Sequence, residues 1–168
     1  RGCEFACDGV LIDVAPTTRI ARCGGCGCRA RRVYDRRRGR LWRHVDLGGM
    51  HTQLRYDLRR VDCRRCGVCT ELVPWAAPDS AFTHAFEQQV AYLAQRTDKT
   101  TVVSMMRIAW ATVGSIVSRV VQRMSPDDRL DGLLRIGVDE LSYRRHHEYI
   151  TVVTDHDSGK IVWAHEGK

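Results

Sequence analysis

The fold is decided by the stretch Thr52-Gln-Leu-Arg-Tyr-Asp-Leu-Arg-Arg-Val-Asp-Cys-Arg-Arg-Cys-Gly67, in which a regular alternation runs straight into a pair of cysteines. The period of two is typical of a half-buried strand. It predicts a strand over Thr52–Arg60, with Leu54, Tyr56 and Leu58 on one face and Arg55, Asp57 and Arg59 on the other. Asp46-Leu-Gly-Gly49 supplies a turn before this strand.

A second cysteine pair, Cys23-Gly-Gly-Cys26-Gly, lies 37 residues before the first. Zinc takes four thiolates at tetrahedral corners, and each Cys-x-x-Cys turn presents two of them. The glycine after each pair lets backbone amides face the sulfurs. Two such turns at the ends of an extended β-hairpin predict a zinc ribbon. Its structural Zn²⁺ would be held by Cys23, Cys26, Cys63 and Cys66.

Other thiols and two histidines leave this ligand set open. Cys28 or Cys69 could replace one ligand, and His44 or His51 could compete for the metal. The remaining thiols, Cys3 and Cys7, fit spare cysteines better than a second site. The competing interpretation of the paired cysteines is a set of buried or redox-active thiols.

The basic charge is concentrated at the start of the chain. The net charge is +7, and residues 1–72 hold 16 Arg against eight Asp and Glu. All but three of the 27 cations are Arg, which matches phosphate geometry best. This composition indicates that the binding partner is a polyanion, and phosphate contacts are expected in Arg29–Arg43 and Arg55–Arg65. The alternative is that these arginines form a solvated surface. The candidate contacts are Arg31, Arg32, Arg36, Arg37, Arg38 and Arg40.

Several classes of protein are disfavoured. No apolar run has the length of a membrane span, and no signal peptide precedes the first cysteine. Clustered cysteines differ from a secreted disulfide framework, so a cytoplasmic protein is expected. A chain that starts with Arg1 and stops just past a strand is interpreted as a fragment.

Helical spacing replaces the alternation after Pro74-Trp-Ala-Ala-Pro78. Helices are predicted over about Ser80–Gln95, over Lys99–Met106 with Asp98 as its cap, and over Trp110–Met124. Ser125-Pro-Asp-Asp128 would end the third helix. Its apolar stripe would be Val113, Ile116, Val117, Val120 and Val121.

The connection Arg107-Ile108-Ala109 predicts a helix-turn-helix whose recognition helix is the third one, although any three-helix bundle has the same spacing. Off its apolar stripe, contacts to base edges or phosphates are expected from Thr112, Ser115, Arg119 and Gln122. A left-handed Arg107 in the turn would cost roughly 1 kcal/mol relative to glycine. Ala109 is likewise a poor cap.

The last part of the chain predicts a small β-sheet. Ile136-Gly-Val-Asp-Glu-Leu-Ser-Tyr143 indicates a buried strand over Leu134–Glu140, followed by a polar turn and a strand over Tyr149–Asp155. Asp157-Ser-Gly159 then turns into a strand over Lys160–Ala164. A carboxylate such as Asp139 on a buried strand requires a cation or a metal ion as partner.

The order of these parts resembles the ISL-three family of bacterial insertion-sequence transposases. The resemblance is carried by Cys23-x-x-Cys26-Gly, Arg59-Arg-Val-Asp-Cys63-x-x-Cys66-Gly, Val73-Pro-Trp-Ala76, Phe82-Thr-x-x-Phe86-Glu, Trp110-x-Thr-Val-Gly114 and Ile136-Gly-Val-Asp-Glu-x-Ser-Tyr143. It departs at Arg107 and Ala109, where the family more often has glycine and serine.

That resemblance implies an α+β, multi-module chain. It would have a zinc-ribbon DNA-binding domain over 1–73, a three-helix helix-turn-helix domain over 79–125, and over 133–168 the first strands of a ribonuclease-H-like α/β catalytic domain. The implied partners are double-stranded DNA at transposon ends and further copies of the chain, in a nucleoid-associated protein without a membrane.

The implied activity is DNA strand cleavage and transfer by a DDE triad that holds two Mg²⁺ or Mn²⁺ ions. Asp139 matches the first acid, as catalytic residue and metal ligand, and the other two acids would lie beyond Lys168. Glu140 points to the opposite side of the strand, whereas Asp155 is interpreted as a turn residue. One alternative is a non-catalytic zinc and helix-turn-helix DNA-binding protein or repressor. Another is a zinc protein that binds RNA or a protein partner.

Overall fold

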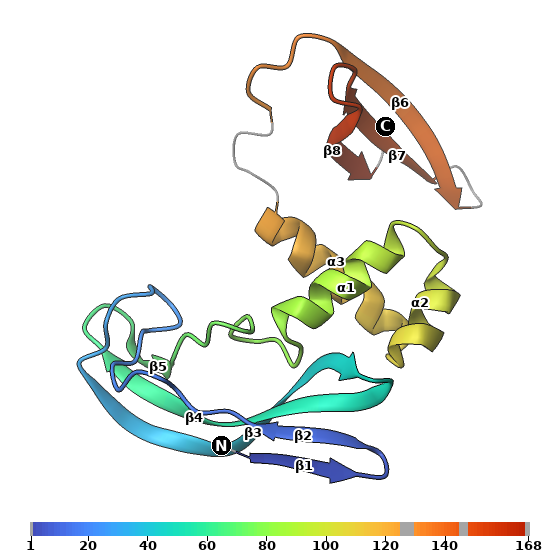
Figure 1. Cartoon of the computed structure of the whole chain (residues 1–168). Helices are drawn as coiled ribbons and strands as arrows, with labels where there is room; N and C mark the ends of the chain where they lie inside the picture. The colour runs from blue at the N-terminus through green and yellow to red at the C-terminus, as the bar shows by residue number, and fades with distance from the viewer. Residues whose placement is uncertain (1, 125–129, 145–147, 167–168) are drawn as a thin grey trace. The chain divides into compact units, whose positions relative to one another are not determined.

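The structure is a computed structural model that describes residues 2–124, 130–144 and 148–166. The chain divides into two compact units, Arg1–Val120 and Val121–Lys168. A five-stranded sheet lies in the first unit and a three-stranded sheet in the second, and the last helix runs across the division (Figure 1). The two units are described separately.

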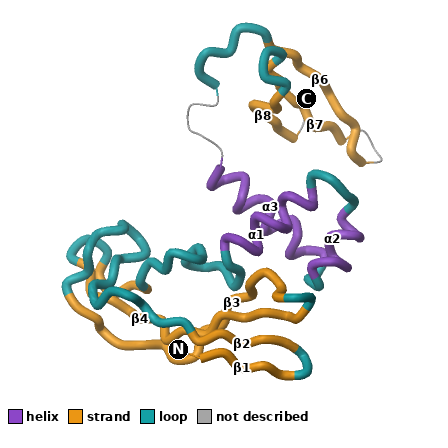
Figure 2. Tube along the Cα trace, viewed as in Figure 1, coloured by secondary structure: helices purple, strands orange, loops and turns teal. Residues whose placement is uncertain are grey.

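A long β-ribbon dominates the first unit. The strands are β1 (Gly2–Ala6), β2 (Gly9–Asp13), β3 (Arg32–Leu47), β4 (Met50–Cys63) and β5 (Gly67–Thr70). Their order is β1-β2-β4-β3, with β5 also paired to β4. All pairs are antiparallel except β2 with β4, which is parallel. The extended hairpin that the cysteine spacing predicts is therefore β3–β4, and loops gather at its cysteine-bearing end (Figure 2).

The predicted glycine turn joins β3 to β4. Gly48 and Gly49 both have positive φ, 59° and 81°, as a two-residue hairpin turn requires. From this turn β4 runs past the predicted end at Arg60 to Cys63, so the strand leads directly into the second cysteine pair.

The predicted alternation of β4 holds only in part. Leu54, Tyr56 and Leu58 are buried as predicted, but Arg59 is buried as well. The prediction that Arg59 faces outward was wrong because other parts of the chain cover this side chain: it donates to the Arg19 carbonyl at 3.3 Å and pairs with Glu71. The buried Glu71 carboxylate accepts from Arg59 Nε at 2.8 Å and from Tyr56 Oη at 2.7 Å.

The segment that was expected to separate two modules packs on the ribbon. Trp75 meets the buried Trp42 edge-on at 5.9 Å between ring centroids, and Tyr56 at 5.4 Å. Val73 and Ala76 complete this small core. The stretch before the helices is therefore part of the sheet's hydrophobic core.

Three helices follow, α1 (His84–Ala94), α2 (Lys99–Met106) and α3 (Trp110–Met124). The bounds of α2 and α3 are those predicted, and Asp98 caps α2 by accepting from the Thr101 amide. The predicted terminator, Ser125–Asp128, lies outside the described residues. Helix α1 begins later than predicted because Thr83 is its N-cap.

The helices share a core with the ribbon. Its buried members are Phe86, Val90, Ala91, Val102, Met106, Val113, Ile116 and Val120, and Val45 of β3 packs against them. One member of the predicted stripe on α3 was wrong: Val121 is 54% exposed, because it lies at the edge of the buried face. Among the described helices, none alone is long and apolar enough to cross a membrane, and the bent pair α2–α3 passes on length and composition only.

The second unit is an antiparallel sheet of β6 (Ile136–Arg144), β7 (Glu148–Asp155) and β8 (Lys160–Glu166) in that order. Gly159, with φ of 66°, makes the predicted turn into β8. The expectation of a buried first strand was wrong, since Ile136 and Val138 are 55% and 64% exposed. The described part of this unit is a single-layered sheet. The polar turn predicted after β6 includes residues 145–147, which lie outside the described ones.

Candidate zinc centre and nucleic-acid interface

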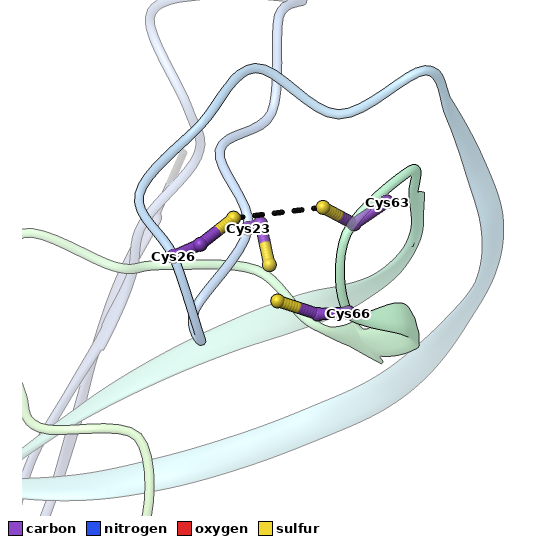
Figure 3. Close-up of side chains that lie close together, drawn as sticks. All are labelled: Cys23, Cys26, Cys63 and Cys66. Carbon is purple, nitrogen blue, oxygen red and sulfur yellow. Dashed lines mark hydrogen bonds between the residues drawn. The ribbon is translucent and has the colours of Figure 1, made fainter.

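Four cysteine sulfurs converge at one end of the ribbon. Cys23 and Cys26 come from the loop before β3, and Cys63 and Cys66 from the end of β4 and the turn after it (Figure 3). Their sulfurs all lie within 4.8 Å of one another, and those of Cys26 and Cys63 are 3.6 Å apart. This brings together the four ligands that the sequence predicts, although the pairs are 37 residues apart in the chain.

Backbone hydrogen bonds hold the two cysteine turns. The Gly27 amide donates to the Cys23 carbonyl at 2.8 Å, and Gly27 and Gly67 both have positive φ after their cysteine pairs. The Gly24 amide donates to the Thr70 carbonyl at 2.9 Å and thereby ties the first turn to β5. A Cβ at Gly24 would lie 2.7 Å from that carbonyl oxygen, so glycine is required there.

The four sulfur donors of the cluster fit zinc. A hydrogen bond from the Cys26 backbone amide, with a further one from the Cys69 thiol, lowers the pKa of Cys23 to about 6. At Cys26 the hydrogen bond from the Cys28 amide is outweighed by the contact with the Cys63 thiol and by burial, so the pKa of Cys26 is instead raised to about 12. The thiolate is the form that binds metal. Four soft donors, two from each turn, match the closed tetrahedral set of a structural zinc site.

The sequence left four alternative ligands open, Cys28, Cys69, His44 and His51, and none of them belongs to the group of four mutually close ligand atoms. The sulfur of Cys69 lies 3.2 Å from that of Cys23. His44 lies 2.9 Å from the Thr83 hydroxyl through Nδ1. Burial lowers the pKa of His44. Cys3 and Cys7 are exposed at the start of the chain, as expected of spare thiols.

The first group of ribbon arginines contains the candidate DNA contacts from the start of the ribbon. Four of them are exposed, namely Arg31, Arg36, Arg37 and Arg38. Arg32 is also exposed but is paired with Asp62 at 3.2 Å. Arg40 is half-buried, donating to the Ser80 carbonyl and lying over the Trp42 ring.

A second group of arginines holds carboxylates inside the unit. Arg55 bonds Asp13 at 2.5 Å and Glu4 at 2.9 Å, and Arg60 bonds Asp35 at 2.7 Å. With Arg59 buried on Glu71, three arginines of Arg55–Arg65 are engaged internally. The expectation that this whole stretch faces phosphates is therefore corrected. The strand pairing brings acids onto these arginines from distant parts of the chain.

The turn of the helix-turn-helix is anchored to the ribbon. Arg107 adopts the predicted left-handed conformation, with φ 53° and ψ 50°. Its guanidinium bonds the Asp46 carboxylate and, at 3.0 Å, the Gly49 carbonyl. These contacts offset the cost of roughly 1 kcal/mol of a left-handed arginine and explain what the side chain does there.

Helix α3 presents only part of its predicted contact set. Ser115 and Gln122 are exposed, and Thr112 is half-buried. Arg119 instead donates through Nε to Glu87 at 2.8 Å, and Glu87 is fully buried and also accepts from the Ser80 hydroxyl at 2.8 Å. Arg119 therefore stabilises a buried carboxylate between α1 and α3, a role that the sequence pattern did not indicate.

We expect Arg119→Ala to destabilise the helices by about 3 kcal/mol, because it leaves the buried Glu87 carboxylate without its cation. Gln122→Ala, a matched change at an exposed position of the same helix, should stay within about 0.5 kcal/mol. Adding Glu87→Gln to Arg119→Ala should recover part of the loss. The measurement is urea unfolding, and equal stability of the two single variants would show that the ion pair contributes nothing.

The acidic pair of β6 lies on the described part of the second unit. Asp139 is exposed, pairs in register with Val152, and accepts the Glu140 amide at 2.8 Å. Glu140 points to the opposite face, as neighbours on a strand do. Among the described residues no carboxylate cluster gathers around Asp139, so these residues alone do not form a site for Mg²⁺ or Mn²⁺.

Asp155 occupies a hairpin turn, as predicted. Its carboxylate accepts from the Ser158 hydroxyl at 2.6 Å and from the Asp157 and Ser158 amides. The Ser158 hydroxyl, followed by these amides, lowers the pKa of Asp155. Its hydrogen bonds close the turn between β7 and β8.

The unit combines a cluster of four cysteines at the end of a long β-ribbon with two helices, α2 and α3, that are joined by a left-handed turn. Together these features define the class of zinc-ribbon helix-turn-helix proteins. Residues 19–66 match the family model of the zinc-finger of transposase IS204/IS1001/IS1096/IS1165, and residues 71–121 that of the helix-turn-helix domain of transposase family ISL3. The chain belongs to this ISL3 family of transposases. Structural zinc is the cofactor of its ribbon.

The relatives are longer proteins. The chain is 47% identical over 161 residues to the transposase for insertion sequence element IS1557 from two strains of Mycobacterium tuberculosis. The matched region covers 94% of this chain and 36% of that protein. The chain is 23% identical over 158 residues to the transposase for insertion sequence element IS1001 of Bordetella parapertussis, covering 94% and 39%. No solved structure matches.

Proposed function

We propose that this chain binds double-stranded DNA at transposon ends as the DNA-binding part of an insertion-sequence transposase. The observation that carries the proposal is the joining of ribbon and helix-turn-helix in one unit by Arg107, Asp46 and Gly49. Two DNA-binding modules held in a fixed relation can contact one duplex together without an ordering cost for each. The relatives, which are all named as transposases, support the same function.

Zinc would be held by Cys23, Cys26, Cys63 and Cys66, and its role would be structural. Such a closed site folds its domain and leaves no position for substrate. The bound metal would fix the cysteine end of the ribbon, where the run of exposed arginines begins.

The DNA contacts that we propose are predicted side chains that the fold leaves exposed, together with the half-buried Thr112. On the ribbon they are Arg31, Arg36, Arg37 and Arg38, and on α3 they are Thr112, Ser115 and Gln122. The arginines would bind phosphates and position the duplex, whereas hydroxyl and amide groups of a recognition helix read base edges. Arg32, Arg40 and Arg119 would first have to leave their internal partners.

Asp139 is proposed as the first acid of a DDE triad in a protein of the relatives' length. Support comes from its place on the first strand of an antiparallel sheet, the expected start of a ribonuclease-H-like domain. Carboxylates suit Mg²⁺ and Mn²⁺, which would activate the attacking oxygen when bound. The described residues supply one such acid, so strand cleavage, and assembly of copies on two ends, would require more of the protein.

The proposed domains are the zinc ribbon over 1–73, the helix-turn-helix over 79–125 and the start of the catalytic domain over 133–168. Helix-turn-helix contacts would then come from the second of these segments and the phosphate contacts mainly from the first.

Binding of the chain to a labelled terminal-repeat duplex, measured by fluorescence anisotropy, tests this function. We expect tighter binding to that duplex than to an unrelated one, and a steep loss of affinity with salt, because exposed arginines release counterions. Equal affinity for unrelated duplexes and single strands would instead favour a zinc protein with another partner. A flat salt response would show that the arginines are a solvated surface.

A further inference from the structure

A basic hollow of about 450 Å³ lies beside the cysteine cluster. It is lined by Cys28, Arg29, Arg31, Cys63, Arg64 and Arg65. All four arginines are exposed, and no carboxylate lines the hollow. All four lie within the ranges Arg29–Arg43 and Arg55–Arg65 where phosphate contacts are predicted, but only Arg31 is among the individually named candidates.

The charges of the four arginines are not neutralised by the part of the chain that the structure describes. None of them forms an ion pair with any residue that the structure describes, in contrast to Arg55, Arg59 and Arg60 of β4. Asp62, next to Cys63, is already paired with Arg32 at 3.2 Å. Four positive charges around one hollow repel one another and attract a polyanion.

The backbone fixes the walls of this hollow. The Arg31 amide donates to the Asp62 carbonyl at 3.0 Å, and the Ala30 amide to the Ala21 carbonyl at 3.0 Å. Arg64 and Arg65 are the two residues enclosed by Cys63 and Cys66, so a metal bound there would hold them as well. Little backbone freedom is then lost when a ligand binds.

We propose that this hollow seats the phosphate backbone of duplex DNA, with Arg29, Arg31, Arg64 and Arg65 as the phosphate contacts. Guanidinium groups bind phosphate oxygens through paired, charge-assisted hydrogen bonds. The inference rests on the proposed DNA-binding function and locates the main phosphate grip at the metal end of the ribbon.

The hollow and the helix-turn-helix anchor lie toward opposite ends of β4. The first residues of β4 adjoin the Gly48–Gly49 turn, which Arg107 contacts, and its last residue is Cys63. A strand of 14 residues spans at most about 45 Å, and one helical turn of DNA is about 35 Å long. The hollow would therefore contact phosphates of the same duplex within about one turn of the anchor.

The test compares two double variants that remove the same charge. Arg64→Gln/Arg65→Gln acts at the hollow, and Arg96→Gln/Lys160→Gln acts at exposed cations outside the ribbon. Binding of the chain to a mixed-sequence duplex is measured over a range of salt. We expect the slope of log K against log salt to fall by about 2 in the first variant and to change little in the second.

Zinc content and circular dichroism check that the first variant is folded. If it loses zinc, Arg29→Gln/Arg31→Gln, which lies outside the cysteine pairs, takes its place with the same expected slope. Hydroxyl-radical footprinting of DNA bound by the hollow variant should show that one patch of protection is lost while another patch remains. Identical slopes for hollow and control variants, with the unaltered chain binding DNA, would overturn this inference alone. Absence of binding by the unaltered chain would overturn the DNA-binding function and the inference with it.

Discussion

Removal of zinc is expected to unfold the cysteine end of the ribbon while the helices keep their core. Apparent free energies of structural zinc binding are about 10–16 kcal/mol, as large as the whole stability of a small domain. The ribbon has only a small core of its own around Trp42 and Trp75. The helices share a larger core that includes Phe86 and Ile116.

The measurement combines chelation with hydrogen exchange. The purified chain should contain about one zinc, in keeping with a single Cys₄ site. A strong chelator should remove the protection of amides in residues 21–31 and 60–71 while that of α1 and α3 persists. Near-zero zinc in a folded chain with all thiols free would exclude the site.

Two serine substitutions separate the ligands from their neighbour. Cys63→Ser removes one of the four converging sulfurs and should abolish tight zinc binding. Cys69→Ser removes the sulfur 3.2 Å from Cys23 but outside that group, and should retain about one zinc per chain. Loss of zinc in Cys69→Ser with retention in another single cysteine variant would assign Cys69 as a ligand.

Asp139→Ala is expected to abolish metal-dependent nicking of transposon-end DNA by the complete transposase. Metal ions stabilise the attacking and leaving oxygens by several kcal/mol, so loss of a ligand should slow strand cleavage about a thousandfold or more. Binding of the same DNA should be unchanged, because Asp139 lies outside the ribbon and the helices.

Glu140→Ala is the matched control for this prediction. It removes a neighbouring carboxylate from the same strand but from the opposite face. We expect it to retain most of the cleavage, measured with a supercoiled plasmid that carries the ends and Mg²⁺ or Mn²⁺. Cleavage by Asp139→Ala at the normal rate would refute the assignment. Absence of cleavage by the unaltered complete protein would favour the repressor alternative.

Local chemistry made several elements predictable. The limits of α2 and α3 followed from helical spacing and from the Asp98 cap, and the glycine turn before β4 followed from Gly48-Gly49. The four converging cysteines were predictable because metal chemistry restricts the spacing within each pair. Each of these signals lies within a few residues of the chain.

Long-range pairs were not predictable. Arg119 and Glu87 are 32 residues apart, and Arg59 and Glu71 are 12 apart, and in each pair an arginine expected to face outward binds a buried carboxylate. No local pattern distinguishes an arginine that faces DNA from one that neutralises a buried acid. The choice depends on which acid the packing brings within reach.

Local sequence accounts for the cysteine pairs, the helices, the basic composition of the first part and the position of Asp139 on a strand. Which arginines remain available depends on the folded chain, because β-sheet pairing places Asp13, Asp35 and Glu71 against Arg55, Arg60 and Arg59. Folding also gathers Arg29, Arg31, Arg64 and Arg65 around one hollow. Charge in a sequence is additive, but its availability depends on neighbours that folding brings together.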